Sequence, residues 1–206
     1  MPRLMVGLGN PGRKYEENRH NVGFMVVEEL RRLASLPDWR EKFSGVMTKG
    51  AAFGEDLVLL KPLTFMNLSG QSVQPAAAFL KVAPADVIVV HDELDIPFGE
   101  VRVKVGGGHA GHNGLRSIIE RLGPDFVRIR MGIGRPPPEF PGDVADYVLH
   151  DFDGSERAEL PGFIERAVDA ARRVVRDGLS VAMNAVNQKA PPRNRPSQKK
   201  ADPGAT

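Results

Sequence analysis

Neutral amide and imidazole side chains recur in this sequence where strands should end or loops should begin. They are Asn10, His20, Asn21, Asn67, His112 and Asn113. An amide donates and accepts hydrogen bonds without carrying a charge, which suits the recognition of a peptide-like substrate. Asn is also common beside turn glycines and before helices for local hydrogen bonding alone. Capping is the commoner role for any one of these residues, whereas several of them at one sheet edge would indicate a binding site.

His20 is the residue that we expect to act as a base. The reference pKa of histidine, about 6.5, keeps neutral imidazole available near neutral pH. A single histidine between Arg19 and Asn21 would ordinarily be an exposed surface residue. Asp92 follows the β-branched run 87–90 and could orient the imidazole and stabilise its protonated form, as the carboxylate of a catalytic triad does. The structural alternative for Asp92 is to cap the following turn.

Two glycine-rich segments match the dinucleotide-binding pattern G-x-G-x-x-G. They are Gly7, Gly9 and Gly12, and Gly106, Gly108 and Gly111. That pattern also requires a helix at the third glycine and an acidic residue about 20 positions later, at the end of a second strand. A polar stretch follows Gly12, and Asp125 precedes its strand. Because the chain has 22 glycines, chance matches are easy, and cofactor binding is the weaker interpretation.

Two other kinds of catalytic site are also weaker alternatives. The nearest approach to a serine nucleophile elbow is segment 178–182, which no predicted strand precedes. A metal site could draw on a cluster of histidines and carboxylates, although their spacing matches no HExxH-type motif. The members of that cluster are His91, Asp92, Glu93, Asp95, His109 and His112. We therefore expect neither a metal nor another cofactor.

The elements that must position these side chains alternate between strands and helices. Apolar runs predict strands over 3–8, 46–53, 57–60, 87–90, 101–105 and 127–133. Apolar residues at helical spacing predict helices over 22–36, 72–80, 112–122, 155–176 and 180–188. Ser155 should cap the long helix, Pro75 should lie in the first turn of its helix, and Pro11-Gly12 predicts a type II turn.

This alternation predicts a single α/β domain with a mixed sheet, because the hairpin around residues 54–56 requires some antiparallel pairing. In α/β folds, ligands bind beyond the carboxyl ends of the strands. Asn10, Asp92 and segment 106–113 all directly follow predicted strands. We therefore expect these residues to meet at one edge of the sheet.

Composition excludes several classes of protein. The chain has 206 residues and no Cys, which removes disulfides, thiolate nucleophiles and cysteine-ligated zinc. No apolar run reaches the roughly 20 residues of a membrane span, and the run after Arg3 is too short for a signal peptide. We expect a cytoplasmic protein. The net charge is only +2, but residues 189–206 are rich in Lys, Arg and Pro and predict a basic, disordered tail after a domain over 1–188.

Six segments, taken in order, resemble bacterial peptidyl-tRNA hydrolase. They are GLGNPG (7–12), RHNVG (19–23), TFMNLSG (64–70), HDELDIPFG (91–99), GGGHAGHNGLRSI (106–118) and RMGIGRP (130–136). The resemblance covers about 3–188 and implies a monomeric α/β enzyme with a mixed, twisted β-sheet flanked by helices. It further implies cleavage of the ester between a peptide and the 3′ end of tRNA, which recycles tRNA from prematurely released peptidyl-tRNA.

The resemblance also implies roles for particular residues. His20 corresponds to the catalytic base, Asp92 to its carboxylate partner, and Asn10 to the position that helps to distinguish N-blocked from unblocked aminoacyl-tRNA. The positions that correspond to substrate or tRNA binding are Tyr15, Phe65, Asn67, Asn113, Lys104 and Arg130. Among these, Lys104 and Arg130 match a clamp for the tRNA 5′ phosphate. Ala110 stands where the family often has Gly.

Two further functions stay open from the residues alone. An NAD-dependent oxidoreductase would bind its dinucleotide through segment 7–12. An RNA-binding protein without catalytic activity would keep the phosphate contacts, which supply much of the affinity for tRNA. Arg102, Arg135 and the basic tail are further candidates for such contacts, although the simpler role for the tail is a solubilising extension.

Overall fold

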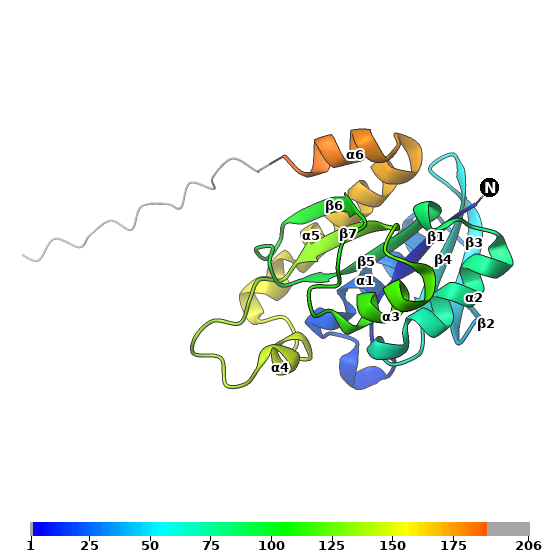
Figure 1. Cartoon of the computed structure of the whole chain (residues 1–206). Coiled ribbons are helices and arrows are strands. Elements are labelled where there is room, and N and C mark those ends of the chain that lie inside the picture. Colours follow the sequence, from blue (N-terminus) through cyan, green and yellow to red (C-terminus); the bar gives the residue numbers. More distant parts are fainter. Residues whose placement is uncertain (1, 189–206) are drawn as a thin grey trace, which may run out of the picture.

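A seven-stranded mixed β-sheet forms the centre of the computed structural model, which describes residues 2–188 (Figure 1). The strands are β1 (Arg3–Gly7), β2 (Arg40–Lys42), β3 (Gly45–Ala52), β4 (Glu55–Pro62), β5 (Val87–Glu93), β6 (Val101–Val105) and β7 (Val127–Gly132). Their order is β2-β3-β4-β1-β5-β7-β6, and β4, β1, β5 and β7 run parallel. The β2–β3, β3–β4 and β6–β7 pairs are antiparallel. The predicted single α/β domain with a mixed sheet is confirmed.

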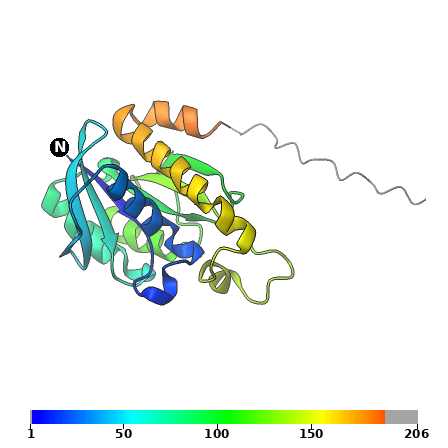
Figure 2. The same cartoon turned by 180° about the vertical axis from the view of Figure 1, so that it is seen from behind.

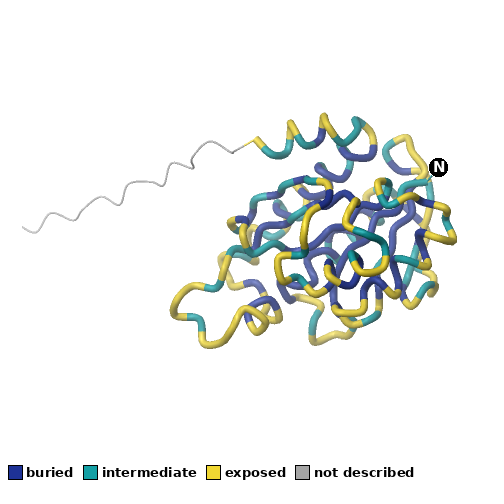
Figure 3. Tube along the Cα trace, viewed as in Figure 1, coloured by how far each residue is buried: buried dark blue, intermediate teal, exposed yellow. Residues whose placement is uncertain are grey.

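Helices cover both faces of this sheet. They are α1 (Val22–Leu33), α2 (Gly70–Leu80), α3 (Asn113–Leu122), α4 (Val144–Val148), α5 (Gly154–Arg176) and α6 (Leu179–Val186). Helices α2 and α3 lie in front in Figure 1, and α1 and α5 lie on the opposite face, seen in Figure 2. Along β1, Leu4 and Val6 pack toward α2 and α3, whereas Met5 packs toward α1 and α5. Burial on both faces explains the continuous apolar runs of the central strands, which Figure 3 shows as the buried interior.

Three local predictions were wrong. Asp153, not Ser155, caps α5, because its side chain accepts the Glu156 N–H while the Glu156 side chain accepts the Asp153 N–H. Helix α2 begins at Gly70, so Pro75 lies beyond its first turn; the Gly70 N–H is satisfied by the Ser117 hydroxyl. Gly12 has the predicted positive φ of 107°, but its ψ of 146° is not that of a type II turn.

The first dinucleotide-like glycine pattern has a packing function. A Cβ atom on Gly7 would lie 2.3 Å from the carbonyl oxygen of Gly23, so Gly7 lets α1 lie directly against β1. Helix α1 begins at Val22 and not at Gly12, the third glycine of the pattern. The second pattern follows β6, which is antiparallel to β7 and therefore forms no βαβ unit with it. Neither segment has the context that dinucleotide binding requires.

The serine alternative is also wrong, because Ser180 lies in α6 directly after α5, with no strand before it. Among residues 2–188, no helix is long and apolar enough to span a membrane. The predicted tail 189–206 lies outside the described residues.

Candidate active site

Loops after the parallel strands converge on one cleft of about 560 Å³. Asn10 follows β1, Phe65 to Asn67 follow β4, and Asp92 lies near the end of β5. His20 reaches the same cleft from the 3₁₀ helix η2 (Arg19–Asn21), which precedes α1. The expectation that Asn10 and Asp92 meet at the carboxyl edge of the sheet is confirmed.

The same expectation was wrong in part for segment 106–113. Because β6 is antiparallel, it ends beside the start of β7, at the opposite edge of the sheet. The glycine-rich loop must therefore run back to the cleft. Arg128 holds that loop, since its buried guanidinium donates hydrogen bonds to the carbonyl oxygens of Gly107 and Gly108. The loop then delivers His112 and Asn113 to the cleft, with Ala110 in the left-handed region at φ 46°.

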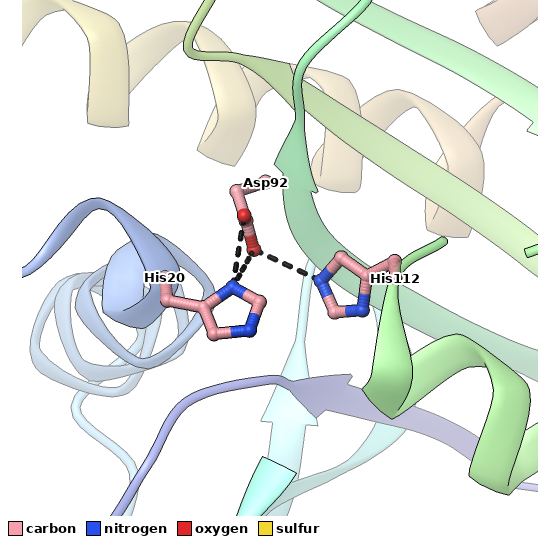
Figure 4. A group of neighbouring side chains, drawn as sticks. All are labelled: His20, Asp92 and His112. Carbon is pink, nitrogen blue, oxygen red and sulfur yellow. Dashed lines mark hydrogen bonds and ion pairs between the residues drawn. The ribbon is translucent and has the colours of Figure 1, made fainter. Parts of the chain in front are cut away.

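His20 and Asp92 form a buried pair. The imidazole Nδ1 lies 2.9 Å from each carboxylate oxygen of Asp92, and the two side chains are 11% and 2% exposed. Figure 4 shows the other ring nitrogen, Nε2, on the side of the ring away from Asp92. An Nδ1–H that donates to the carboxylate leaves Nε2 as a proton acceptor. The arrangement is that of a base oriented by a carboxylate.

Arg19 accounts for the unexpected burial of His20. Its guanidinium donates to the carbonyl oxygen of Asp151 at 2.8 Å and pairs with Glu156 at 2.6 Å. It also lies 4.2 Å from the centroid of the Tyr147 ring. These contacts hold η2 against residues 147–156, which run from α4 into the first turn of α5. His20, expected at the surface, is therefore buried.

His112 donates to the same carboxylate from the other side. Its Nε2 lies 2.9 Å from Asp92 Oδ1, while its Nδ1 accepts hydrogen bonds from the backbone N–H groups of Gly114 and Leu115. It is thus the N-cap of α3. Burial acts to raise the pKa of Asp92, but the interactions with His20 and His112 hold that pKa well below its ordinary range. Asp92 is a carboxylate at neutral pH.

A metal ion suits this cluster poorly. His20, Asp92 and His112 each offer a ligand atom, and these atoms lie within 4.8 Å of one another. To bind a metal, His112 Nε2 would have to lose its proton, which would move to Nδ1. Nδ1, however, faces two backbone N–H donors. A proton on Nδ1 would be repelled by their hydrogens, and both N–H groups would lose their acceptor. Of the other metal candidates, His91 donates through Nδ1 to the Asp92 carbonyl oxygen, and burial lowers its pKa to about 3.

Asn10 is fixed in one orientation. Its backbone N–H and carbonyl are both bound by the side-chain amide of Asn21, at 2.8 and 2.9 Å. The Met66 N–H donates to Asn10 Oδ1 at 2.8 Å, so the Nδ2 group is the donor left over. Among residues 2–188, Nδ2 has no acceptor. The amide N–H groups of Asn10 are therefore available to a ligand in the cleft.

The other predicted side chains of the cleft are exposed. Asn67, Asn113 and Phe65 line it, and Phe65 is 58% exposed. The wall opposite is apolar and comes from α4 and the residue after it: Val144, Ala145, Val148 and Leu149. Sequence reasoning missed this wall because α4 has only five residues, too few for a helical pattern to be recognised.

Tyr15, Lys104 and Arg130 do not line this cleft. Tyr15 lies half-buried in the 3₁₀ helix Arg13–Tyr15. Lys104 pairs with Arg128 across β6 and β7, and Arg102 pairs with Arg130, so the four cations share one sheet face. We call this the basic face. Partial burial, together with the charges of Arg130 and Arg128, lowers the pKa of Lys104. The Arg130 guanidinium lies 4.0 Å from the Glu93 carboxylate.

Fold and cleft together define an α/β protein with a histidine–carboxylate pair suited to general base catalysis.

Comparison with known proteins identifies the family. A family model described as peptidyl-tRNA hydrolase matches residues 4–194. A protein of Sorangium cellulosum with that name is 54% identical over 204 residues, 98% of this chain and 91% of the relative. One of Geotalea daltonii is 52% identical over 188 residues, 91% of this chain and 97% of the relative. The crystal structure of peptidyl-tRNA hydrolase from Acinetobacter baumannii has a TM-score of 0.84 at 41% identity, covering 90% of this chain and 94% of that chain. The chain belongs to the peptidyl-tRNA hydrolase family and is a hydrolase.

Proposed function

We propose that this protein hydrolyses the ester between a peptide, or an N-blocked aminoacyl group, and the 3′ end of tRNA, with His20 as the base. The observation that carries the proposal is the His20–Asp92 pair at 2.9 Å, set in a cleft lined by the amides of Asn10, Asn67 and Asn113. Family membership supports the substrate, since the relatives are named for it. The reaction recycles tRNA from prematurely released peptidyl-tRNA.

The proposed chemistry needs one base and no covalent intermediate. His20 Nε2 takes a proton from water as the water oxygen attacks the ester carbonyl carbon. Asp92 stabilises the imidazolium that forms. The tetrahedral intermediate then collapses, the bond to the tRNA ribose oxygen breaks, and the imidazolium returns the proton to that oxygen. An ester has a good leaving group compared with an amide, so activated water suffices without a metal or other cofactor.

Amide donors serve the intermediate and the peptide. One well-placed donor to a tetrahedral oxyanion is worth roughly 3 kcal/mol. Asn67 and Asn113 would bind the peptide backbone and the tRNA 3′ end, with Phe65 and Tyr15 as further binding positions. Contacts to a peptide backbone tolerate many side chains, as a recycling enzyme requires. The apolar wall of α4 gives those side chains a surface.

Asn10 would select N-blocked substrates. The side-chain oxygen of Asn10 already accepts a hydrogen bond from the Met66 N–H. The side-chain N–H groups therefore face the substrate, where they would repel a free ammonium group. Asn10→Asp places a carboxylate there and should favour the ammonium, so the preference for N-acetyl-aminoacyl-tRNA over aminoacyl-tRNA should shrink. Hydrolysis rates of the two substrates measure it, and an unchanged ratio would remove Asn10 from this role.

The basic face would bind the tRNA 5′ phosphate through Lys104 and Arg130. Both side chains are half-buried, with Arg102 and Arg128 beside them. A cluster of cations attracts phosphate groups regardless of the nucleotide sequence, which suits an enzyme that acts on many tRNAs.

We further propose that the protein acts as a monomer in the cytoplasm. Sedimentation velocity and cell fractionation test these two points.

The decisive experiment is hydrolysis of N-acetyl-aminoacyl-tRNA in EDTA by the wild-type protein and by His20→Ala. We expect release of the acyl group by the wild type and a loss on the order of a thousandfold in the variant. Cleavage that survives in His20→Ala would keep the activity but overturn the mechanism. No cleavage by the wild type, with tRNA binding retained, would indicate an RNA-binding protein; recovery with divalent ions would indicate a metal-dependent enzyme.

A further inference from the structure

We propose that His112 is a positioning residue of this reaction. It would act as a neutral imidazole, fixed in one tautomer by the N-terminus of α3, that holds the Asp92 carboxylate in the orientation that binds His20. The inference rests on the proposed function. The structure brings two imidazoles from distant parts of the chain onto one carboxylate, and Figure 4 shows both rings directed at it.

The tautomer of His112 follows from its partners. Nδ1 lies 3.1 Å from the Gly114 nitrogen and 3.3 Å from the Leu115 nitrogen, and both backbone groups are N–H donors. Nδ1 must therefore carry a lone pair and no proton. The neutral ring then has its proton on Nε2, which is the atom that faces Asp92 Oδ1 at 2.9 Å.

The Asp92 carboxylate depends on these two rings. Among residues 2–188, its hydrogen-bond donors are His20 Nδ1 and His112 Nε2. With His20 alone, both oxygens of a side chain that is 2% exposed would share a single N–H donor, and the carboxyl group could rotate. The second donor fixes its plane. It also takes up part of the negative charge that would otherwise act on His20.

Helix α3 links this orientation to substrate binding. Asn113, which lines the cleft, is the first residue of α3, and His112 is its N-cap. One short segment thus presents an amide to the substrate on one side and an imidazole to Asp92 on the other. A shift of the segment would disturb both the substrate contact and the orientation of the base.

The variant His112→Asn separates the two functions of this residue. Asn is a good N-cap, and its side-chain oxygen can take the place of Nδ1 on Gly114 and Leu115. Its side chain ends there, so it cannot reach Asp92 as the more distant Nε2 does. His112→Ala removes the cap and the contact together. A purely structural cap would be rescued by Asn, whereas a positioning residue would not.

We expect His112→Asn to unfold at the wild-type temperature, to keep the wild-type KM, and to lose kcat on the order of tenfold to a hundredfold. Its pH–rate profile should also change. Without His112 Nε2–H, more of the Asp92 charge acts on His20 and favours the imidazolium, so the acid limb should move to higher pH. His112→Ala should show the same loss of kcat and, in addition, a lower unfolding temperature.

Two kinetic results would overturn the proposal. One is a wild-type kcat and pH profile in His112→Asn; the other is a raised KM with an unchanged pH profile, which would place His112 on the substrate. Imidazole ¹⁵N spectra of the wild-type protein test the tautomer without any substrate. A proton on Nδ1 of His112 would refute the inference even if the enzyme is active. If the tautomer is as stated but the wild type does not hydrolyse the ester, the proposed function fails and not the geometry.

Discussion

The reaction centre and the basic face are built in opposite ways. In the reaction centre, Asp92 is 2% exposed and is bound by two imidazoles at 2.9 Å, while Asn10 is fixed by Asn21 and Met66. On the basic face, Arg130 is 24% exposed and its nearest carboxylate lies 4.0 Å away. Breaking a bond requires donors and a base in fixed positions, whereas a phosphate responds to charge over a wider range of geometries. Fixed geometry is therefore concentrated where we expect bonds to change.

The largest effect should come from Asp92→Asn in the reaction centre. His112 can only donate from Nε2, so the Asn oxygen must turn toward His112 and its NH₂ group toward His20. His20 Nδ1 would then have to accept, which places the proton on Nε2 and removes the base. We expect kcat to fall about a thousandfold or more, with little change in KM.

Steady-state kinetics measure this effect, and imidazole ¹⁵N spectra report the tautomer of His20. The matched control is Asp95→Asn, a similar change at an exposed carboxylate nearby that pairs with Arg135. It should leave kcat unchanged. An Asp92→Asn enzyme within about tenfold of the wild type would mean that Asp92 does not set the tautomer.

A second prediction concerns the buried His91 behind the reaction centre. Burial lowers its pKa from the ordinary value of 6.5 to about 3. Between these values the unfolded chain binds a proton that the folded chain does not, so stability falls as pH decreases. The free energy of unfolding should drop by about 1.4 kcal/mol per pH unit below pH about 6.5. The contribution of Asp92, whose pKa is lowered, is lost only at more acid pH.

Urea unfolding at pH 7 and pH 5 measures this effect against His91→Asn. The Asn amide can still donate to the Asp92 carbonyl oxygen, as Nδ1 does, but it does not titrate. The wild type should lose roughly 2 kcal/mol more than the variant between the two pH values. Equal losses would show that His91 is protonated in the folded protein as readily as in the unfolded chain.

The same contrast separates what the sequence predicts from what it does not. Asn10 and Asp92 could be placed because each follows a predicted strand, and the carboxyl ends of parallel strands meet at one edge of the sheet. The burial of His20 could not be predicted, since it depends on contacts between Arg19 and residues 147–156, which are far away in the sequence. The predicted helix start at His112 indicated a cap, but not the carboxylate that the ring also binds.

The basic face should respond to charge more than to position. Lys104→Ala removes one cation that we expect to contact phosphate, and should reduce the slope of log affinity against log salt by about 1. kcat at saturating substrate should stay close to the wild-type value. The matched control is Lys49→Ala, an exposed lysine on β3 near the other edge of the sheet. Filter binding of tRNA across salt concentrations measures both, and equal slopes in the two variants would remove Lys104 from the phosphate contact.

The smallest effect should come from Asn187, which supports the basic face from its edge. Its side-chain amide accepts from the Val103 N–H and donates to the Val103 carbonyl, both at 2.8 Å, so it pairs with the outer edge of β6 as a strand would. Val103 lies between Arg102 and Lys104. Asn187→Ala should lower the free energy of unfolding by about 1 kcal/mol.

The opened edge of β6 should also promote self-association, because an exposed strand edge pairs with other chains. Binding of 5′-phosphorylated tRNA should weaken by no more than about threefold. All cations of the basic face remain, and only the position of Lys104 becomes less fixed. Asn184→Ala, at an exposed asparagine in α6, the helix that Asn187 follows, is the control and should change none of these quantities. If Asn187→Ala instead weakened phosphate binding as strongly as Lys104→Ala, the basic face would depend on fixed geometry as the reaction centre does, and the contrast between them would fail.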